Sequence, residues 1–226
     1  MNRFFTLFIS LSILLCAACD PSEFIVRTVA GDTIVGSGQI IREDRDLSQF
    51  DSVEVSGSMD VEITRGEKLK CVVEGDDNII PLVKTEVSNR NLNIYVDQSF
   101  SIQQTVNVYL EVPEISGVLL SGSGNIEFTD VTRDRVEISV DGSGDITAAG
   151  EVENLTAEIS GSGDMHLFNL YSENATVEIN GSGDVEVRVN NSLDCEINGS
   201  GDIHYSGNPA TVKRSVNGSG DITWRE

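Results

Sequence analysis

Acidic residues recur at one spacing in the C-terminal half of this chain, and carboxylates at fixed intervals can bind cations. An asparagine or aspartate directly follows each of six Gly-Ser-Gly triplets, at Asn125, Asp145, Asp164, Asp184, Asp202 and Asp221. Calcium requires several oxygen ligands, and columns of carboxylate, amide and hydroxyl groups would offer them. The aspartates of this column are therefore candidate calcium ligands.

A structural role is the alternative for the same aspartates. Carboxylates about 4.8 Å apart on neighbouring strands repel by roughly 0.9 kcal/mol in water, so a stack of them needs compensation. Aspartate commonly accepts backbone N–H groups in tight turns, which would supply that compensation without an ion. We favour the structural role, keep calcium binding as the alternative and expect no cofactor.

The Gly-Ser-Gly triplets themselves repeat at nearly constant intervals. They begin at Gly122, Gly142, Gly161, Gly181, Gly199 and Gly218, so successive intervals are 20, 19, 20, 18 and 19 residues. Such a period, with short strands in each unit, is typical of a solenoid, in which each coil buries its apolar face only against its neighbours. We therefore predict an all-β fold, a β-solenoid with about 19–20 residues per coil in the C-terminal half.

Apolar and polar residues alternate through each unit with the two-residue period of a β-strand. Two aligned apolar columns are predicted to be stacked core positions: Leu120, Val140, Ile159, Ile179, Ile197 and Val216, and then Ile126, Ile146, Met165, Val185, Ile203 and Ile222. The triplet glycines share the inward parity. A β-carbon there would clash or force an unfavourable backbone angle, so the triplet is predicted to form a tight corner.

The last unit departs from this pattern. Arg214 stands where the preceding unit has Cys195, and Trp224 follows close to the end. Terminal repeats of solenoids are atypical because one of their faces lacks a neighbour. The pattern predicts a terminal coil adapted to an open end.

Residues 36–117 repeat less regularly than residues 118–226, and we interpret residues 36–226 as one β-solenoid domain with irregular coils at its start. GSGQI at residues 36–40 and SGSMDVEI at residues 56–63 are predicted to form the same corner, with Met59 in place of the second glycine.

The segments that connect strands are predicted to differ from coil to coil. TDVTRD, AAGEVEN, FNLYSEN and VRVNNS read as loops, where a partner can be recognised. In the irregular part, Asp77 or Asn78 would cap a short helical turn that Pro81 limits.

The N-terminus has the features of a secretory signal. Arg3 precedes an apolar run at residues 4–15, which is short for a bilayer span and makes a membrane-spanning helix the weaker interpretation. Ala17, Ala18 and Cys19 resemble the lipobox of bacterial lipoproteins, which implies removal of residues 1–18 and lipid attachment at Cys19. Ordinary cleavage that leaves a free Cys19 thiol is the alternative.

Lipid attachment would make residues 19–35 an acylated N-terminus and linker. Several acyl chains on one cysteine anchor a protein firmly to a membrane. We expect a lipoprotein of the cell envelope, in the outer membrane, with its domain in the periplasm or exposed at the surface.

Charge and cysteine content exclude several classes of protein. The 37 acidic and 15 basic residues give a net charge of -22, which opposes the phosphate neutralisation that nucleic-acid binding requires. Cys71 and Cys195 are too few for a disulfide framework, and Cys195 is predicted to be a buried thiol. His166 and His204 share an outward column with Glu186 and are assigned to a solvated face rather than to a metal site.

A family resemblance covers about residues 36–226. FDSVEVSGSMDVEITRGEKLKCVVEGDDNIIPLVKTEV, VNVYLEVPEISGVLLSGSGNIEF and the repeated GSGDI together resemble the putative auto-transporter adhesin, head GIN domain family of bacterial envelope proteins. The resemblance implies a right-handed parallel β-helix. It carries over no catalytic residues.

Three functional classes remain. The leading hypothesis is a lipid-anchored, non-catalytic binding module whose faces engage a glycan or an envelope or host protein. A polysaccharide-active enzyme is the second, because parallel β-helices often host such enzymes. A scaffold that assembles through its coil ends is the third, and the sequence does not determine the oligomeric state.

Overall fold

The computed structural model describes residues 34–226, apart from residue 99 and residues 102–104. The predicted signal peptide, residues 1–18, and the predicted lipid attachment site Cys19 lie outside the described residues, so both stay predictions. Among the residues described, no helix is long and apolar enough to cross a membrane.

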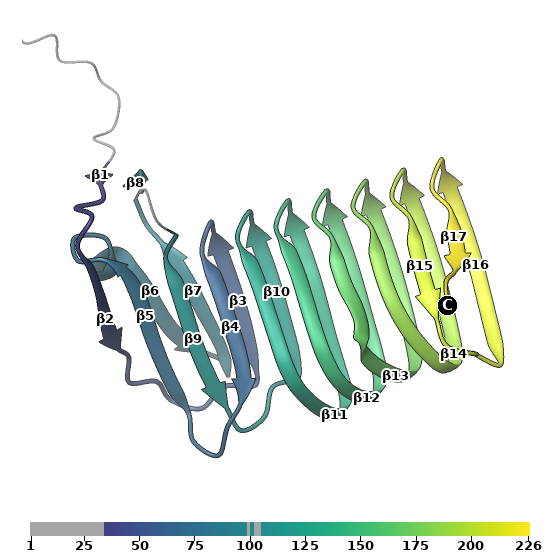
Figure 1. Cartoon of the computed structure of the whole chain (residues 1–226), viewed down its shortest axis with the longest axis horizontal. Coiled ribbons are helices and arrows are strands. Elements are labelled where there is room, and N and C mark those ends of the chain that lie inside the picture. Colours follow the sequence, from purple (N-terminus) through teal and green to yellow (C-terminus); the bar gives the residue numbers. More distant parts are fainter. Residues whose placement is uncertain (1–33, 99, 102–104) are drawn as a thin grey trace, which may run out of the picture. The chain divides into compact units, whose positions relative to one another are not determined.

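Most of the described residues are in β-strands, which confirms the predicted fold class (Figure 1). In chain order the elements are β1 (Ile34–Val35), β2 (Ile40–Asp44), β3 (Ser52–Gly57), β4 (Asp60–Arg65), β5 (Lys70–Asp76), the 3-10 turn η1 (Ile80–Leu82), β6 (Val83–Ser88), β7 (Asn91–Val96), β8 (Phe100–Ser101), β9 (Asn107–Val112), β10 (Gly117–Gly122), β11 (Asn125–Gly142), β12 (Asp145–Gly161), β13 (Met165–Gly181), β14 (Val185–Gly199), β15 (Ile203–Ser206), β16 (Thr211–Gly218) and β17 (Ile222–Trp224).

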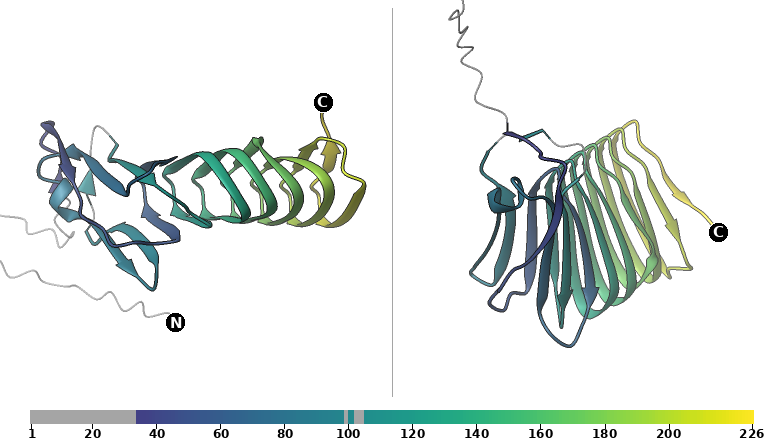
Figure 2. Two further views of the ribbon diagram at one scale, coloured as in Figure 1. Left: turned by 90° about the horizontal axis from the view of Figure 1, so that it is seen from below. Right: turned by 60° about the vertical axis from the view of Figure 1, so that its left-hand side comes forward.

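The strands β11 to β14 form the regular part of the solenoid. Each runs around almost a whole coil, and each pairs in parallel with the coil before and the coil after it (Figure 2). The register places Ile146 opposite Met165, Met165 opposite Val185, and Val185 opposite Ile203, all fully buried. The predicted period and the predicted core columns are therefore confirmed in these coils.

Glycine is required at the predicted corner because consecutive coils approach each other there through their backbones. Gly122, Gly142 and Gly161 lie in one register column, and a β-carbon on Gly142 would overlap the carbonyl oxygen of Gly122. Likewise, a β-carbon on Gly163 would overlap the carbonyl oxygen of Gly144. The obstacle is thus the corner of the preceding coil, and backbone cannot rotate away from it as a side chain could.

The other corner of each coil differs from the prediction. The segments expected to be loops lie inside β11, β12, β13 and β14, so the loop interpretation is wrong. The chain turns there by local register shifts, for example between Phe128 and Val131 and between Leu167 and Tyr171. Pairing with the neighbouring coils resumes directly after each shift, so the turn satisfies most of its backbone polar groups without a separate loop.

The start of the solenoid is not stacked in sequence order. Strand β3 lies between β7 and β10, and β4 lies between β9 and β11. Gly57 pairs with Gly122, and Met59 is fully buried in place of the second glycine, as the SGSMDVEI motif predicted. The coil formed by β3 and β4 therefore lies between two sets of strands that both follow it in the chain: β7 and β9 on one side, and β10 and β11 on the other.

Antiparallel strands complete this end of the sheet. Strand β2 pairs with β5, β5 with β9, and β6 with β7, all antiparallel. The GSGQI motif leads into β2 and does not join the column of corner glycines, so its predicted role is wrong. Side chains of the Asp-Asp-Asn sequence hold this segment instead: Asp76 Oδ1 accepts the Gly38 N–H at 2.5 Å, and Asn78 Oδ1 accepts the Ser37 N–H at 2.9 Å.

The short turn predicted near Pro81 is present as η1, but its cap is not. Ile79 is the N-cap residue, and no side chain caps the turn. Asp77 and Asn78 are engaged with Ser37, so their oxygens are committed to the segment before β2.

The C-terminal coil leaves one face of the core open, as predicted. Val216 occupies the predicted core column but remains 43% exposed, because no further coil covers it. Trp224 is 54% exposed. Arg214 pairs with Cys195 in the register and donates a hydrogen bond to the Tyr205 hydroxyl, which places a cation over the end of the core.

Candidate functional site

The aspartate column forms a hydrogen-bonded ladder beside the glycine corner. Asp145 Oδ1 accepts the Asp164 N–H at 2.9 Å, and Asp164 Oδ1 accepts the Asp184 N–H at 2.8 Å. The same contact continues through Asp202 to Asp221, at 2.7 and 2.8 Å. The structure thus brings together all five sequence-predicted aspartates and gives each of the first four a structural hydrogen bond.

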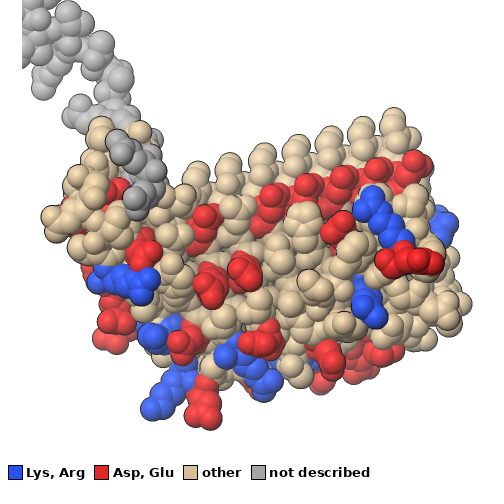
Figure 3. Space-filling view, in the orientation of Figure 1, with Lys and Arg blue, Asp and Glu red and all other residues tan. Residues whose placement is uncertain are grey.

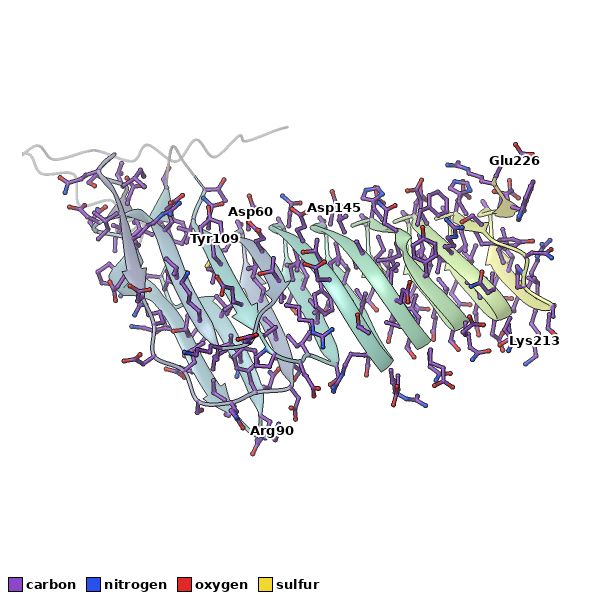
Figure 4. All side chains as sticks on the ribbon, turned by 60° about the horizontal axis from the view of Figure 1, so that its bottom comes forward. Asp60, Arg90, Tyr109, Asp145, Lys213 and Glu226 are labelled. Atoms are coloured by element: carbon purple, nitrogen blue, oxygen red, sulfur yellow. The ribbon has the colours of Figure 1, made fainter. Side chains whose placement is uncertain are left out.

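The donor in this ladder differs from the expected one. The sequence predicted hydrogen bonds within one glycine corner, whereas each carboxylate accepts the N–H of the following coil. Asp60, labelled in Figure 4, makes the same kind of contact nearer the N-terminus, where its Oδ1 accepts both the backbone and the side-chain N–H of Asn125 at 2.9 Å. Its place after Met59, in the irregular copy of the corner, is the sequence signal that could have identified it.

The calcium alternative for these aspartates needs several ligands at one point. In the described ranges, no group of three or more histidine, cysteine, aspartate or glutamate side chains is placed to hold a metal ion. The carboxylates instead follow one another along the coils, and acidic side chains run in a row on the face shown in Figure 3. A row offers each position few ligands, which favours the structural interpretation.

An asparagine ladder accompanies the carboxylates on the other side of the corner. Asn198 donates to Asn180 Oδ1 and Asn217 donates to Asn198 Oδ1, both at 3.0 Å. Asn180 also donates to Glu178 at 2.8 Å and Asn198 donates to Glu196 at 3.2 Å, so the amides stabilise carboxylates of the glutamate column. The sequence analysis did not identify this ladder, although asparagine immediately before three Gly-Ser-Gly triplets was its signal.

The two histidines take part in an exposed polar cluster near the C-terminal end. His166 Nδ1 lies 3.3 Å from Glu186 Oε2, and Arg225 reaches the other oxygen of Glu186 at 3.5 Å. Arg225 also lies 2.6 Å from His204 Nε2. The histidines and Glu186 share one register column, as predicted. Arg225, which directly follows β17, also contacts this column, and the sequence pattern did not predict that contact.

The two described thiols are buried, unpaired and protonated at neutral pH. Burial raises the pKa of Cys71 to about 11 and the pKa of Cys195 to about 12. A nucleophilic cysteine needs a lowered pKa and some exposure. The predicted role of Cys195 as a buried thiol is therefore consistent with its surroundings.

Two of the shallow grooves on the described residues have an aromatic ring beside an arginine. One, of about 240 Å³, lies over β4, β5 and β9, where Arg42 packs over the Tyr109 ring at 5.5 Å from its centroid and pairs with Glu74. Lys70, the other cation of this groove, pairs with Glu111 at 3.3 Å, so both cations and the Tyr109 ring, which Figure 4 labels, are engaged within the protein.

The other groove, of about 480 Å³, lies at the second corner of the coils. Tyr171 lines it and is 43% exposed, with the Arg188 guanidinium 4.3 Å from the centroid of its ring. In the register, Tyr171 stands between Glu151 of the preceding coil and Arg188 of the following one.

Known proteins share this architecture. A family model described as "Putative auto-transporter adhesin, head GIN domain" matches residues 49–209. A solved structure of a putative adhesin from Bacteroides fragilis NCTC 9343 aligns with a TM-score of 0.70 and 22% identity, over 85% of this chain and 100% of that chain. No curated protein matches the chain.

Two further solved structures, both from Parabacteroides distasonis ATCC 8503, are similar. A putative lipid binding protein aligns with a TM-score of 0.55 and 24% identity, over 86% of this chain and 100% of that chain. A putative adhesin aligns with a TM-score of 0.54 and 22% identity, over the same shares. At these identities, the similarity to the solved structures shows a common fold.

Proposed function

Because this chain belongs to the putative auto-transporter adhesin, head GIN domain family, we propose that it is an adhesin-like binding module of the bacterial cell envelope, anchored by lipid at Cys19 and without catalytic activity. The family match over residues 49–209 supports an adhesin-like module. Lipid attachment and the absence of catalysis are parts of the proposal that the family match does not address.

The register of the coils is the structural observation that supports binding most directly. Because β11 to β14 stack in register, equivalent outward side chains form columns on a backbone that is hydrogen-bonded on both sides. Rigid, repeated display of side chains reduces the entropy lost when a partner binds, and solenoids use such extended faces for binding.

A binding experiment tests the proposal. Residues 20–226 would be produced without the signal and lipid, labelled, and applied to arrays of glycans and of bacterial envelope and extracellular-matrix proteins. We expect saturable binding to at least one class of ligand. Binding to none of them at micromolar protein concentration would contradict the proposal.

Lipid anchoring has a separate test. The native chain should partition into the membrane fraction and gain the mass of a diacylglyceryl group and an N-acyl chain on Cys19. A C19S variant should lose that mass and stay out of the membrane fraction, because both chains attach to this one residue. An unmodified Cys19 in the membrane-bound native protein would contradict lipidation.

Two observations bear on the alternatives. Four of the ladder carboxylates already accept backbone N–H groups, which disfavours them as general acids or bases. Incubation of the protein with neutral and anionic polysaccharides should therefore release no new reducing ends.

The edge strand β16 bears on assembly through coil ends. Lys213 and Arg214 lie on it, and charged edge residues hinder strand pairing between molecules. Sedimentation over a hundredfold concentration range should therefore show one species.

A further inference from the structure

Tyr171 is a held but accessible aromatic ring. Its neighbour Ser172 is buried and donates a hydrogen bond to the Arg188 carbonyl at 2.7 Å, which joins the corners of two consecutive coils. The Arg188 guanidinium then packs on the Tyr171 ring, 4.3 Å from its centroid. The ring is thereby oriented before any ligand arrives, while 43% of the residue remains exposed.

The groove lies alongside this ring. It is lined by the two coils that precede Tyr171, through residues 132–134 and 151–153, and by Glu173 and Asn190. Arg188 comes from the following coil, where it pairs with Tyr171 on the side away from Glu151, and it does not line the groove. The Tyr171 ring therefore contacts the Arg188 guanidinium and also lines an open groove of about 480 Å³.

The polar groups of the groove are mainly hydrogen-bond acceptors. Asp134, Glu151, Glu153 and Glu173 present carboxylates, and Thr132 and Asn190 add a hydroxyl and an amide, all on exposed residues. The basic side chain of the lining, Arg133, is paired with Glu114 at 2.6 Å. Such a surface suits a ligand that donates several O–H groups, and it repels carboxylate or sulfate groups.

We propose that the groove beside Tyr171 binds a neutral glycan, with the apolar face of one pyranose ring stacked on Tyr171 and its hydroxyls donating to the surrounding carboxylates. The proposal rests on the binding function proposed above and names its ligand class and its site. A neutral sugar combines an apolar C–H face with vicinal hydroxyl donors, and hydroxyl-to-carboxylate hydrogen bonds are stronger than those between neutral groups. Anionic glycans are excluded by the four carboxylates.

Binding of defined oligosaccharides to residues 20–226 tests the proposal. The panel would hold neutral tetrasaccharides of glucose, mannose, galactose and N-acetylglucosamine, together with sulfated and uronic-acid tetrasaccharides of equal length. Calorimetry should detect binding of at least one neutral member and of no anionic member. Tyr171→Ala should weaken that binding by about tenfold or more, because it removes the stacking surface.

Four further variants extend the test, and three of them are controls. Tyr171→Phe keeps the ring and should keep the affinity within about twofold, whereas Trp224→Ala removes an exposed aromatic residue elsewhere and should change nothing. The triple change E151Q/E153Q/E173Q should weaken neutral binding. The control E158Q/E178Q/E196Q alters the same number of charges farther along β12 and β13 and on β14, and it should not weaken binding. Tyr171 lies outside the core, so Y171A should melt like the native protein.

The outcomes separate this inference from the broader proposal. Neutral glycan binding that Tyr171→Ala leaves unchanged, or binding of anionic glycans or of proteins alone, would overturn the site and ligand class but leave an adhesin-like module. No binding to any glycan or protein would overturn both.

Discussion

The two corners of each coil solve the same problem, turning the chain between faces, in different ways. At the Gly-Ser-Gly corner, successive coils touch through their backbones, so each glycine obliges the next coil to have glycine at the same place. At the second corner the turn is made by register shifts that differ between coils, and its side chains vary. Equally close backbone approach occurs at the second corner at Gly150 and Gly207, whereas the other side chains of that corner vary and can carry a recognition surface.

The largest change in stability is expected when a β-carbon is added at the Gly-Ser-Gly corner. Gly163→Ala should destabilise the protein by about 4 kcal/mol or prevent folding, because the new methyl would overlap the Gly144 carbonyl oxygen and neither backbone can move alone. Chemical denaturation would measure the change.

Two control variants complete that test. Asn190→Ala, at the second corner, should change stability by less than about 0.5 kcal/mol because its side chain is exposed. Gly38→Ala meets no atom and should cost only about 1 kcal/mol, from its backbone angle of +79°. A Gly163→Ala protein as stable as these two would contradict the role of close backbone approach.

The next largest effect compares a covered coil with the uncovered one. Ile159→Ala should cost about 3 kcal/mol, because Ile159 is fully buried between the coils on either side. Val216→Ala, in the same column of the terminal coil, should cost less than about 1 kcal/mol since Val216 is 43% exposed. Equal losses in thermal or urea unfolding would mean that the terminal face is covered in solution.

The aspartate ladder should give a smaller effect. Asp184→Ala removes the acceptor for the Asp202 N–H and should cost about 1 kcal/mol, whereas Asp184→Asn keeps an oxygen acceptor, removes one repulsive charge and should leave stability unchanged or slightly raised. Thermal unfolding with and without millimolar calcium would measure both. A calcium-dependent rise in the native protein that Asp184→Asn abolishes would instead favour cation binding.

The smallest signal is expected from the thiols. Because burial raises the pKa of Cys71 to about 11 and that of Cys195 to about 12, few thiolates exist at pH 8, and the folded protein should react negligibly with an aromatic disulfide reagent. Both thiols should react once denaturant is added. Rapid reaction of Cys195 alone in the folded state would show that the regular coils open more readily than the irregular start.

Site residues that recur in every coil could be predicted from the sequence, and a residue that occurs once could not. Asp145, Asp164, Asp184 and Asp202 were identified because the corner recurs with them, and the structure gives them one shared role. Tyr171 occurs once, and nothing in the spacing distinguishes it from other tyrosines. Its orientation comes from Arg188, which a register shift brings opposite it.

The sequence by itself determined the coil period, the inward columns such as Ile146, Met165 and Val185, and the need for glycine at one corner. These properties follow from local alternation and from contacts between identical positions of successive repeats, which a repeated sequence displays directly. Only the tertiary structure decided that β3 pairs with β7 and β10, that the GSGQI segment lies outside the column of corner glycines, and that the second corner lies within strands. Those outcomes depend on pairing between segments without a common repeat, where one sequence pattern permits several registers and the packed sheet selects one.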